Sequence, residues 1–152
     1  MKILMVCLGN ICRSPLAEGI LKSKVSSDIT VDSAGTGDWH IGQQPDPRSV
    51  AIARENSLDI TDQRGRQFSA ADFENFDRIY AMDNSNYENI IAQARSDEDI
   101  KKVSLILNEI FPGEDHDVPD PYFGGESGFK NVFDMLNEAC DVIVEKINNN
   151  SL

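Results

Sequence analysis

The segment of this chain best suited to chemistry runs from Cys7 to Ser14, where five residues separate a cysteine from an arginine followed by a serine. Thiolate is the nucleophilic form of cysteine, and arginine presents a planar fork that binds two oxygens of one phosphate. Backbone N–H groups wrapped at a helix start add an anion cradle. The pattern predicts a phosphate-binding loop in which Arg13 and Ser14 help to keep Cys7 ionised at neutral pH. The alternative is a buried structural cysteine before an ordinary turn.

The flanking residues favour a tight loop between a strand and a helix. Ile3–Leu8 is a continuous apolar run, which is typical of a buried strand. Gly9 and Asn10 are residue types that tolerate left-handed backbone. Ser14 followed by Pro15 is typical of a helix N-cap and the first helical position. We therefore expect the loop to follow the first strand directly, with a helix beginning at Pro15.

Asp120 is the candidate for the acid that phosphate transfer requires. A positioned acid that protonates the leaving oxygen accelerates such a step by about 10²–10⁴-fold. Pro121 follows it and restricts Asp120 to extended backbone. Asp-Pro is also a common turn dipeptide, so the residues alone leave a solvated acidic turn as the alternative.

Short apolar runs alternate with amphipathic ones along the chain, which predicts strands separated by helices. The expected strands are Ile3–Leu8, Ile29–Ser33, Arg78–Met82 and Val103–Leu107. The expected helices are Pro15 to about Val25, Pro47 to about Asn56, Ala70–Phe76 with Ser69 as N-cap, Ser85–Ala94 and Phe129–Ile147, with loop from Leu107 to about Gly128. This order predicts an α/β fold with a four-stranded parallel sheet and helices on both faces. In such sheets the ligand lies beyond the carboxyl ends of the strands, here at the loop after the first strand.

Composition and charge exclude several classes of function. The 152 residues suit a single domain. The net charge of −12 argues against nucleic acid or an anionic membrane surface as partner. No apolar run is long enough for a membrane span, and the N-terminal run is too short for a signal peptide. We expect a cytoplasmic protein without a disulfide framework.

Metals, cofactors and tight oligomers are not expected either. His40 and His116 are the only histidines, and neither has metal-ligand spacing with a cysteine or another histidine. We therefore expect no metal and no cofactor. The composition predicts no large exposed apolar face, so we expect a monomer or a weak dimer.

The Cys7–Ser14 segment, with Val6 before it and Pro15 after it, resembles the phosphate-binding loop of the low-molecular-weight protein tyrosine phosphatases. The resemblance covers essentially the whole chain, because further segments fall in order where that family has them: Asp32–Thr36, Phe76-Asp77, Ala81–Asp83 and Asp120–Tyr122. It implies one phosphatase domain over residues 1–152. The implied reaction is hydrolysis of phosphotyrosine and small aryl phosphate monoesters through a phosphocysteine intermediate, with tyrosine-phosphorylated proteins as partners.

The resemblance also implies roles for individual residues. Cys7, Arg13 and Asp120 are the expected catalytic residues, with Asp120 as proton donor. Trp39 and Tyr122 are the expected walls of a deep slot for the phosphoaryl group, although Trp39 could instead anchor the core. The other residues expected to bind substrate are those of the loop: Leu8, Gly9, Asn10, Ile11, Cys12 and Ser14.

Residues outside the loop are implied to support it. Asn10, Ser33 and Asp83 match family positions that hold the loop by hydrogen bonds, and Asp83 also suits a helix N-cap. Gln63 stands where similar phosphatases carry a histidine before an Arg-Gln pair. Cys12 matches a thiol that forms a reversible disulfide with the nucleophile in similar phosphatases, with simple packing as the alternative.

Other reaction classes use related scaffolds. An arsenate reductase needs further thiols around the third strand and the following helix, and residues 81–94 contain no cysteine. A phosphocysteine carrier needs neither the arginine six residues after the cysteine nor an aspartic acid, and both are present here. A catalytically idle phosphoprotein-binding module would not need Cys7, Arg13 and Asp120 together.

Overall fold

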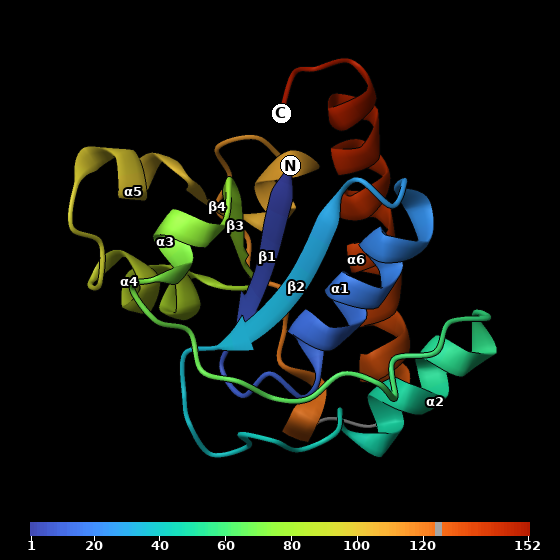
Figure 1. The fold of residues 1–152 in the computed structure, drawn as a ribbon. Coiled ribbons are helices and arrows are strands. Elements are labelled where there is room, and N and C mark those ends of the chain that lie inside the picture. The colour runs from blue at the N-terminus through green and yellow to red at the C-terminus, as the bar shows by residue number, and fades with distance from the viewer. Residues whose placement is uncertain (124–125) are drawn as a thin grey trace.

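A four-stranded parallel sheet lies at the centre of the computed structural model, which describes residues 1–123 and 126–152. Its strands are β1 (Lys2–Cys7), β2 (Thr30–Gly35), β3 (Arg78–Ala81) and β4 (Val103–Leu105), in the spatial order β2-β1-β3-β4 (Figure 1). The predicted α/β class and parallel sheet are therefore confirmed. β2 and β3 flank β1 on opposite sides, which makes the carboxyl end of β1 the switch point where such sheets bind ligands.

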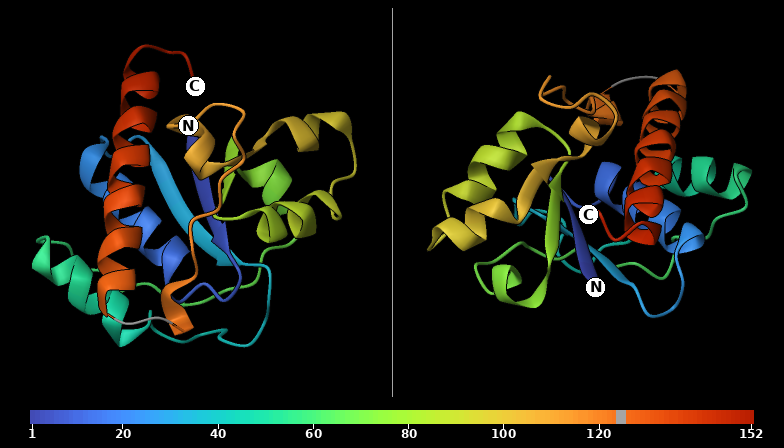
Figure 2. Two further views of the ribbon diagram at one scale, coloured as in Figure 1. Left: turned by 180° about the vertical axis from the view of Figure 1, so that it is seen from behind. Right: turned by 90° about the horizontal axis from the view of Figure 1, so that it is seen from above.

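Helices cover both faces of the sheet, as predicted. One face carries α1 (Arg13–Lys24), α2 (Pro47–Glu55) and α6 (Glu126–Asn148), and the other carries α3 (Asp72–Asn75), α4 (Asn84–Ile91) and α5 (Asp97–Lys101) (Figure 2). The 3₁₀ helix η1 (Ile106–Glu109) begins where the fourth strand was predicted to continue to Leu107, and a second one, η2 (Pro121–Phe123), lies in the region predicted to be loop.

Alternating side chains of β1 build two cores. Ile3 and Met5 face the larger cluster with α1 and α6, while Leu4 and Val6 face the smaller cluster with Phe73. All four strand residues are fully buried. A strand buried on both faces reads as a continuous apolar run, which is why the sequence identified β1 so directly.

The element boundaries differ from the predictions where polar residues govern the ends. α1 begins at Arg13 with Cys12 as N-cap, so Ser14 and Pro15 lie inside its first turn. The predicted N-cap role of Ser14 is therefore wrong. Ser69 is not an N-cap either, because α3 follows Ala71. The acidic helix α5, which has no buried residue, was not predicted because it lacks an apolar face.

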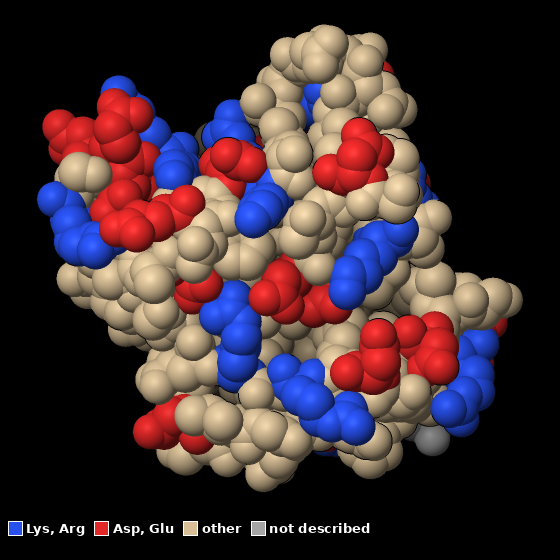
Figure 3. All heavy atoms as spheres, viewed as in Figure 1, with Lys and Arg blue, Asp and Glu red and all other residues tan. Residues whose placement is uncertain are grey.

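Charged side chains of both signs are distributed over the face in Figure 3, with acidic groups densest over α5. The surface therefore offers no broad positive region on this face that would attract an anion. No helix in the described ranges is both long and apolar enough to span a bilayer.

Candidate active site

Cys7 ends β1 and lies at the base of the loop that leads into α1. Its side chain is buried, with 2% of the residue exposed. The backbone N–H of Asn10 donates to the Cys7 Sγ atom over 3.3 Å, and the Ser14 hydroxyl lies 3.0 Å from the same sulfur. Two hydrogen-bonding groups therefore converge on the predicted nucleophile.

Asn10 organises the loop through its backbone and its side chain. Its φ of 57° is left-handed, as predicted. Its Nδ2 atom donates to Ser14 Oγ at 2.8 Å and to Ser33 Oγ at 3.0 Å, while its Oδ1 atom accepts from the backbone N–H of Arg66 at 3.0 Å. The Ser14 oxygen thus accepts from Asn10, and its own hydrogen has two acceptors within reach, Cys7 Sγ at 3.0 Å and the Ala34 carbonyl at 3.4 Å.

The residue type of Gly9 suggested a left-handed conformation, but Gly9 does not have one. Among the described glycines, only Gly42 and Gly113 have positive φ. The constraint at Gly9 is space: a Cβ atom there would lie 3.1 Å from the His40 ring. The missing side chain thus lets the 40–43 turn pack against the loop. His40 Nδ1 lies 2.9 Å from Gln43 Oε1 in that turn.

Arg13 lies beneath the loop in a fixed position. Its Nη1 atom donates to Asp83 Oδ2 at 2.7 Å and to the Val118 carbonyl at 2.9 Å. Asp83 also caps α4 by accepting from the Asn86 N–H, so both contacts predicted for it are present. Burial by itself lowers the pKa of Arg13, but the negative charges of Cys7, Asp83 and Asp120 outweigh burial and raise that pKa. The guanidinium therefore stays charged inside the protein.

Asp120 faces the same guanidinium from the other side of the site. Its Oδ2 atom lies 3.6 Å from Arg13 Nη2, and its side chain is 35% exposed. Its Oδ1 atom accepts from the Tyr122 N–H at 3.0 Å, which closes a tight turn around Pro121. The structure thus brings Cys7 and Arg13 of one loop together with Asp120 from a distant segment.

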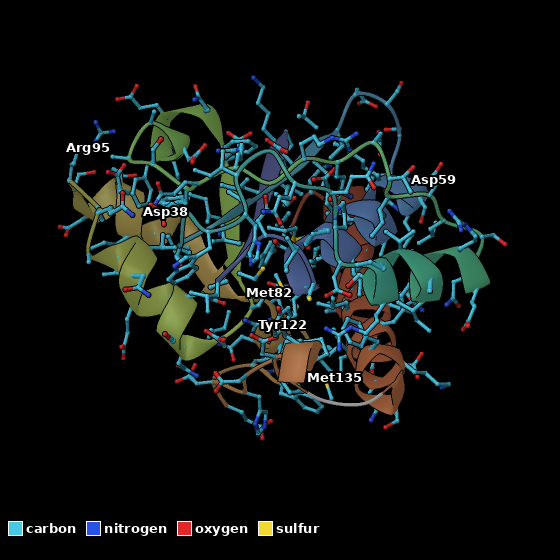
Figure 4. The ribbon with its side chains drawn as sticks, turned by 90° about the horizontal axis from the view of Figure 1, so that it is seen from below. Asp38, Asp59, Met82, Arg95, Tyr122 and Met135 are labelled. Carbon is cyan, nitrogen blue, oxygen red and sulfur yellow. The ribbon has the colours of Figure 1, made fainter. Side chains whose placement is uncertain are left out.

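These residues open into a slot of about 170 Å³ at the carboxyl end of β1. Figure 4 views this end of the sheet and places Tyr122 near its middle. Trp39 is 65% exposed, so it is not the core anchor considered as an alternative. The lining is Cys7, Leu8, Gly9, Ile11, Cys12, Arg13, Trp39, His40, Asp120 and Tyr122.

The loop residues divide into those that line the slot and those that act from behind it. Asn10, Ser14 and Ser33 are buried and do not belong to the lining. Ser33 donates to Glu18 Oε1 at 2.7 Å, and Lys22 donates to the other oxygen of Glu18 at 2.7 Å. Burial raises the pKa of Glu18, although the hydrogen bonds from Lys22 and Ser33 act in the opposite direction.

Sequence reasoning missed several of these contacts. Glu18, the Val118 carbonyl and the Arg66 N–H all support the loop, but none stands in a recognisable motif. Gln63, at the place where a histidine was expected, donates to the Pro15 carbonyl at 3.0 Å. His40 entered the sequence analysis only as a rejected metal ligand, and it lines the slot.

The two thiols of the loop differ in environment. Burial, followed by the charges of Asp46, Cys7 and Asp120, raises the pKa of Cys12 from 9.0 to about 12. Cys12 packs with Ile11 and Phe129, and both loop cysteines are free thiols. Cys12 therefore remains protonated at neutral pH.

Within the described residues, no group of three or more His, Cys, Asp or Glu side chains is placed to hold a metal ion.

Comparison with known proteins gives a consistent result over the whole length. A sequence model of the family described as low molecular weight phosphotyrosine protein phosphatase matches residues 2–152. The low molecular weight phosphotyrosine protein phosphatase of Schizosaccharomyces pombe is 41% identical over 152 residues, covering 96% of each chain.

Solved structures agree with the sequence relatives. The protein tyrosine phosphatase of Entamoeba histolytica superposes with a TM-score of 0.92 at 38% identity, covering 100% of this chain and 99% of that one. The Drosophila arginine phosphatase superposes with a TM-score of 0.89, also at 38% identity, over 97% and 98% of the two chains.

Proposed function

This chain belongs to the low molecular weight phosphotyrosine protein phosphatase family and is a protein tyrosine phosphatase, and we propose that Cys7, Arg13 and Asp120 carry out its reaction. The observation that supports this assignment best is the convergence of all three on one slot, with Asp120 3.6 Å from Arg13. The comparisons do not favour the arsenate reductase or the phosphocysteine carrier. Proteins of the family act on tyrosine-phosphorylated proteins.

The first step of the proposed reaction transfers the phosphoryl group to sulfur. The phosphate lies on the loop N–H groups and on the Arg13 fork. The Cys7 thiolate attacks phosphorus, so that a P–S bond forms while the P–O bond to the phenol breaks. Asp120 donates its proton to the departing oxygen. The Ser14 hydroxyl, whose oxygen lies 3.0 Å from the sulfur, donates its hydrogen to the thiolate in place of the Ala34 carbonyl.

The second step regenerates the enzyme. Water attacks the phosphocysteine, the P–S bond breaks, and Asp120 accepts the proton that the water loses. Inorganic phosphate leaves, and Cys7 is again a thiolate. Arg13 and the loop N–H groups stabilise the equatorial oxygens in both steps, because phosphoryl transfer depends mainly on positioning and charge stabilisation.

The walls of the slot suit an aryl group in this proposal. Trp39 and Tyr122 present rings on the rim, so the ring of phosphotyrosine can pack between them while its phosphate reaches Cys7. Phosphoserine is too short to reach a sulfur at the base of the loop. The preference for phosphotyrosine therefore follows from depth rather than from any contact with the phosphate.

Phosphate release under reducing conditions tests the assignment. The wild-type protein is compared with Cys7→Ser on a phosphotyrosine peptide, its phosphoserine counterpart and a phosphoarginine peptide. We expect release from phosphotyrosine alone, with kcat/KM at least about 10⁴-fold lower in Cys7→Ser. Cys140→Ser, which removes a buried thiol outside the slot, is the matched control. No release from phosphotyrosine would overturn the assignment, and faster release from phosphoarginine would move the substrate class to that of the Drosophila relative.

Cys12 has a proposed protective role. Peroxide oxidises the Cys7 thiol to a sulfenic acid, and one water is released. The Cys12 sulfur then attacks the Cys7 sulfur, the S–O bond breaks, and the hydroxyl leaves with the Cys12 proton as a second water, which gives a Cys7–Cys12 disulfide. An external thiol reduces it by exchange. Mass spectrometry after peroxide treatment should find this link, and Cys12→Ser should lose activity that dithiothreitol no longer restores. Full recovery of the Cys12→Ser variant would contradict the role.

A further inference from the structure

A second cavity lies beside the slot, between α2 and the first turns of α6. Its volume is about 300 Å³, at the lower end of the range for ligand pockets of ~300–1,000 Å³. Its floor is apolar and its rim is charged. The floor is made by Ile52 and Phe129, with Ala51 at its exposed edge, and the rim by Arg48, Glu55, Ser127 and Lys130.

One aromatic side chain and one arginine separate this cavity from the slot. The Arg48 guanidinium lies 5.4 Å from the centre of the Tyr122 ring and 4.7 Å from that of Phe129, distances typical of cation–π contact. Tyr122 lines the slot and Arg48 lines the cavity. In Figure 4, Tyr122 lies between Asp38, the neighbour of Trp39, on one side and α2 on the other. A ligand that crosses Tyr122 from the slot therefore reaches the cavity.

The floor of the cavity also contacts the phosphate-binding loop from behind. Phe129 is 2% exposed and packs with Ile11 and Cys12, and Ile52 packs against the same cluster. Ile11 and Cys12 in turn line the slot. The two hollows thus lie on opposite sides of one apolar partition.

The charges on the rim are largely balanced. Arg48 pairs with Asp46 at 3.0 Å, and Lys130 pairs with Asp134 at 2.9 Å. With these cations matched, and Glu55 also on the rim, the rim gives little preference for an acidic group. The chemistry of the floor therefore sets the preference, and it suits an aliphatic or aromatic side chain.

We propose that this cavity is a specificity subsite that takes an apolar side chain of the phosphotyrosine-bearing protein, two residues from the phosphotyrosine. The proposal rests on the proposed function of the slot. In an extended peptide, side chains alternate between faces, so residues two positions apart point to the same side about 7 Å from each other. The phosphotyrosine then enters the slot while its second neighbour enters the cavity over Tyr122 and Arg48.

Matched phosphopeptides test the subsite. Four peptides carry leucine or serine two residues before or two residues after the phosphotyrosine, and kcat/KM is divided by that of free phosphotyrosine with the same enzyme. We expect leucine to raise this ratio by about tenfold over serine at one of the two positions. Ala51→Phe fills the cavity from an exposed position on α2, and should reduce the leucine preference to less than about threefold.

Two further variants make the result specific. Ser127→Phe fills the cavity from the exposed first turn of α6, so it should act like Ala51→Phe even if that variant folds poorly. Ala92→Phe places the same ring at an exposed alanine beside α4, on the other face of the sheet, and should keep the leucine preference.

The outcomes separate the two levels of the proposal. Equal ratios for leucine and serine at both positions, in an enzyme that hydrolyses free phosphotyrosine, would overturn the subsite alone. A leucine preference that survives both Ala51→Phe and Ser127→Phe would also overturn it. An enzyme that hydrolyses no phosphotyrosine at all would overturn the proposed function, and the subsite with it.

Discussion

Two loops meet at the slot, and they are held in very different ways. In the loop from Cys7 to Ser14, Leu8 reaches solvent, but residues 10–14 are buried and the polar side chains bond within the protein: Asn10 is 3% exposed and Arg13 is 2% exposed. The segment from Val118 to Tyr122 reaches solvent, with Tyr122 42% exposed. The groups proposed to bind and attack phosphate are therefore held by buried contacts, while Asp120, the proposed proton donor, lies on a more exposed support.

The neighbouring elements explain this contrast. The Cys7 loop joins a central strand to the first buried turn of α1, so it is fixed at both ends. The other segment is attached at Val118, whose N–H donates to the Met82 carbonyl at 2.8 Å. Beyond that point, Asp120 is held by the Tyr122 N–H and by Arg13. Substitutions in the first loop should therefore impair every step, and substitutions in the second should impair proton transfer selectively.

Arg13→Lys should give the largest loss among the substitutions that keep Cys7. Lysine keeps the charge but loses the planar fork, so it cannot hold Asp83, the Val118 carbonyl and phosphate together. We expect kcat/KM for phosphotyrosine to fall about 10³-fold. Arg54→Lys, the same change at an exposed position on α2, is the control. A loss below tenfold in Arg13→Lys would mean that charge alone suffices and that the loop is less preformed than its contacts indicate.

Asp120→Asn should give the next largest loss, and one that depends on the leaving group. The phenol of tyrosine is weakly acidic, with a pKa of about 10, so its departure needs protonation. We expect kcat to fall about 10²-fold for phosphotyrosine, and much less for an aryl phosphate with a more acidic phenol. The basic limb of the pH–rate profile should also flatten.

Glu114→Gln separates proton donation from a change of charge near the slot. It removes one negative charge from an exposed position in the same region of the chain. It should keep both the leaving-group dependence and the basic limb. Equal losses for both substrates in Asp120→Asn would show that Asp120 acts only through its contact with Arg13.

Asn10 tests whether side-chain hydrogen bonds or backbone conformation hold the first loop. Asn10→Gly keeps the left-handed conformation accessible but leaves Ser14, Ser33 and the Arg66 N–H without their partner. It should destabilise the protein by at least ~2 kcal/mol and lower kcat/KM about tenfold. Asn10→Ala should be less stable than Asn10→Gly by a further ~1 kcal/mol, because alanine resists positive φ. Urea unfolding measures both values, and equal stabilities of the two variants would contradict the conformational part.

The same contrast explains how much of the molecule could be predicted from the sequence. β1 is predictable because burial on both faces leaves a run of apolar residues, and the loop is predictable because Cys7 and Arg13 lie between that run and the start of a helix. Asp83 was placed correctly because a residue just after β3 must lie near the loop after β1 in a parallel sheet.

The predictions from the sequence were wrong where one residue type can serve two structural roles. Ser14 is of a residue type typical of an N-cap, but it lies inside the first turn of α1, and its hydroxyl lies 3.0 Å from Cys7 Sγ. Contacts made by backbone atoms, such as the Val118 carbonyl and the Arg66 N–H, cannot be predicted from residue types, because every residue type has these backbone groups. The cavity beside α2 also depends on how α2 and α6 pack, which local patterns do not encode.

The smallest expected effect is the contribution of the Cys12 thiol to the pH dependence of the unfolding free energy. It tests how well the first loop excludes water. The Cys12 thiol titrates near 9.0 in an unfolded chain and at about 12 in the folded protein, because it is buried near Asp46, Cys7 and Asp120. The folded state thus holds this proton more tightly. The stability that results is complete below pH 9 and is lost as the pH rises from 9 towards 12, by up to ~1.4 kcal/mol per pH unit.

The variant Cys12→Ser removes this dependence. Between pH 9 and pH 10, the wild-type protein should lose about 1 kcal/mol more of its unfolding free energy in urea than Cys12→Ser does. Cys140→Ser is the matched control, because burial raises the pKa of Cys140 to about 12 as well, and it should reduce the loss by a similar amount. Parallel pH curves for the wild type and Cys12→Ser, with a shallower curve for Cys140→Ser, would mean that Cys12 ionises in the native loop as it does in the unfolded chain. The loop would then be open to water at Cys12, and the contrast with the exposed Asp120 segment would be smaller than the contacts indicate.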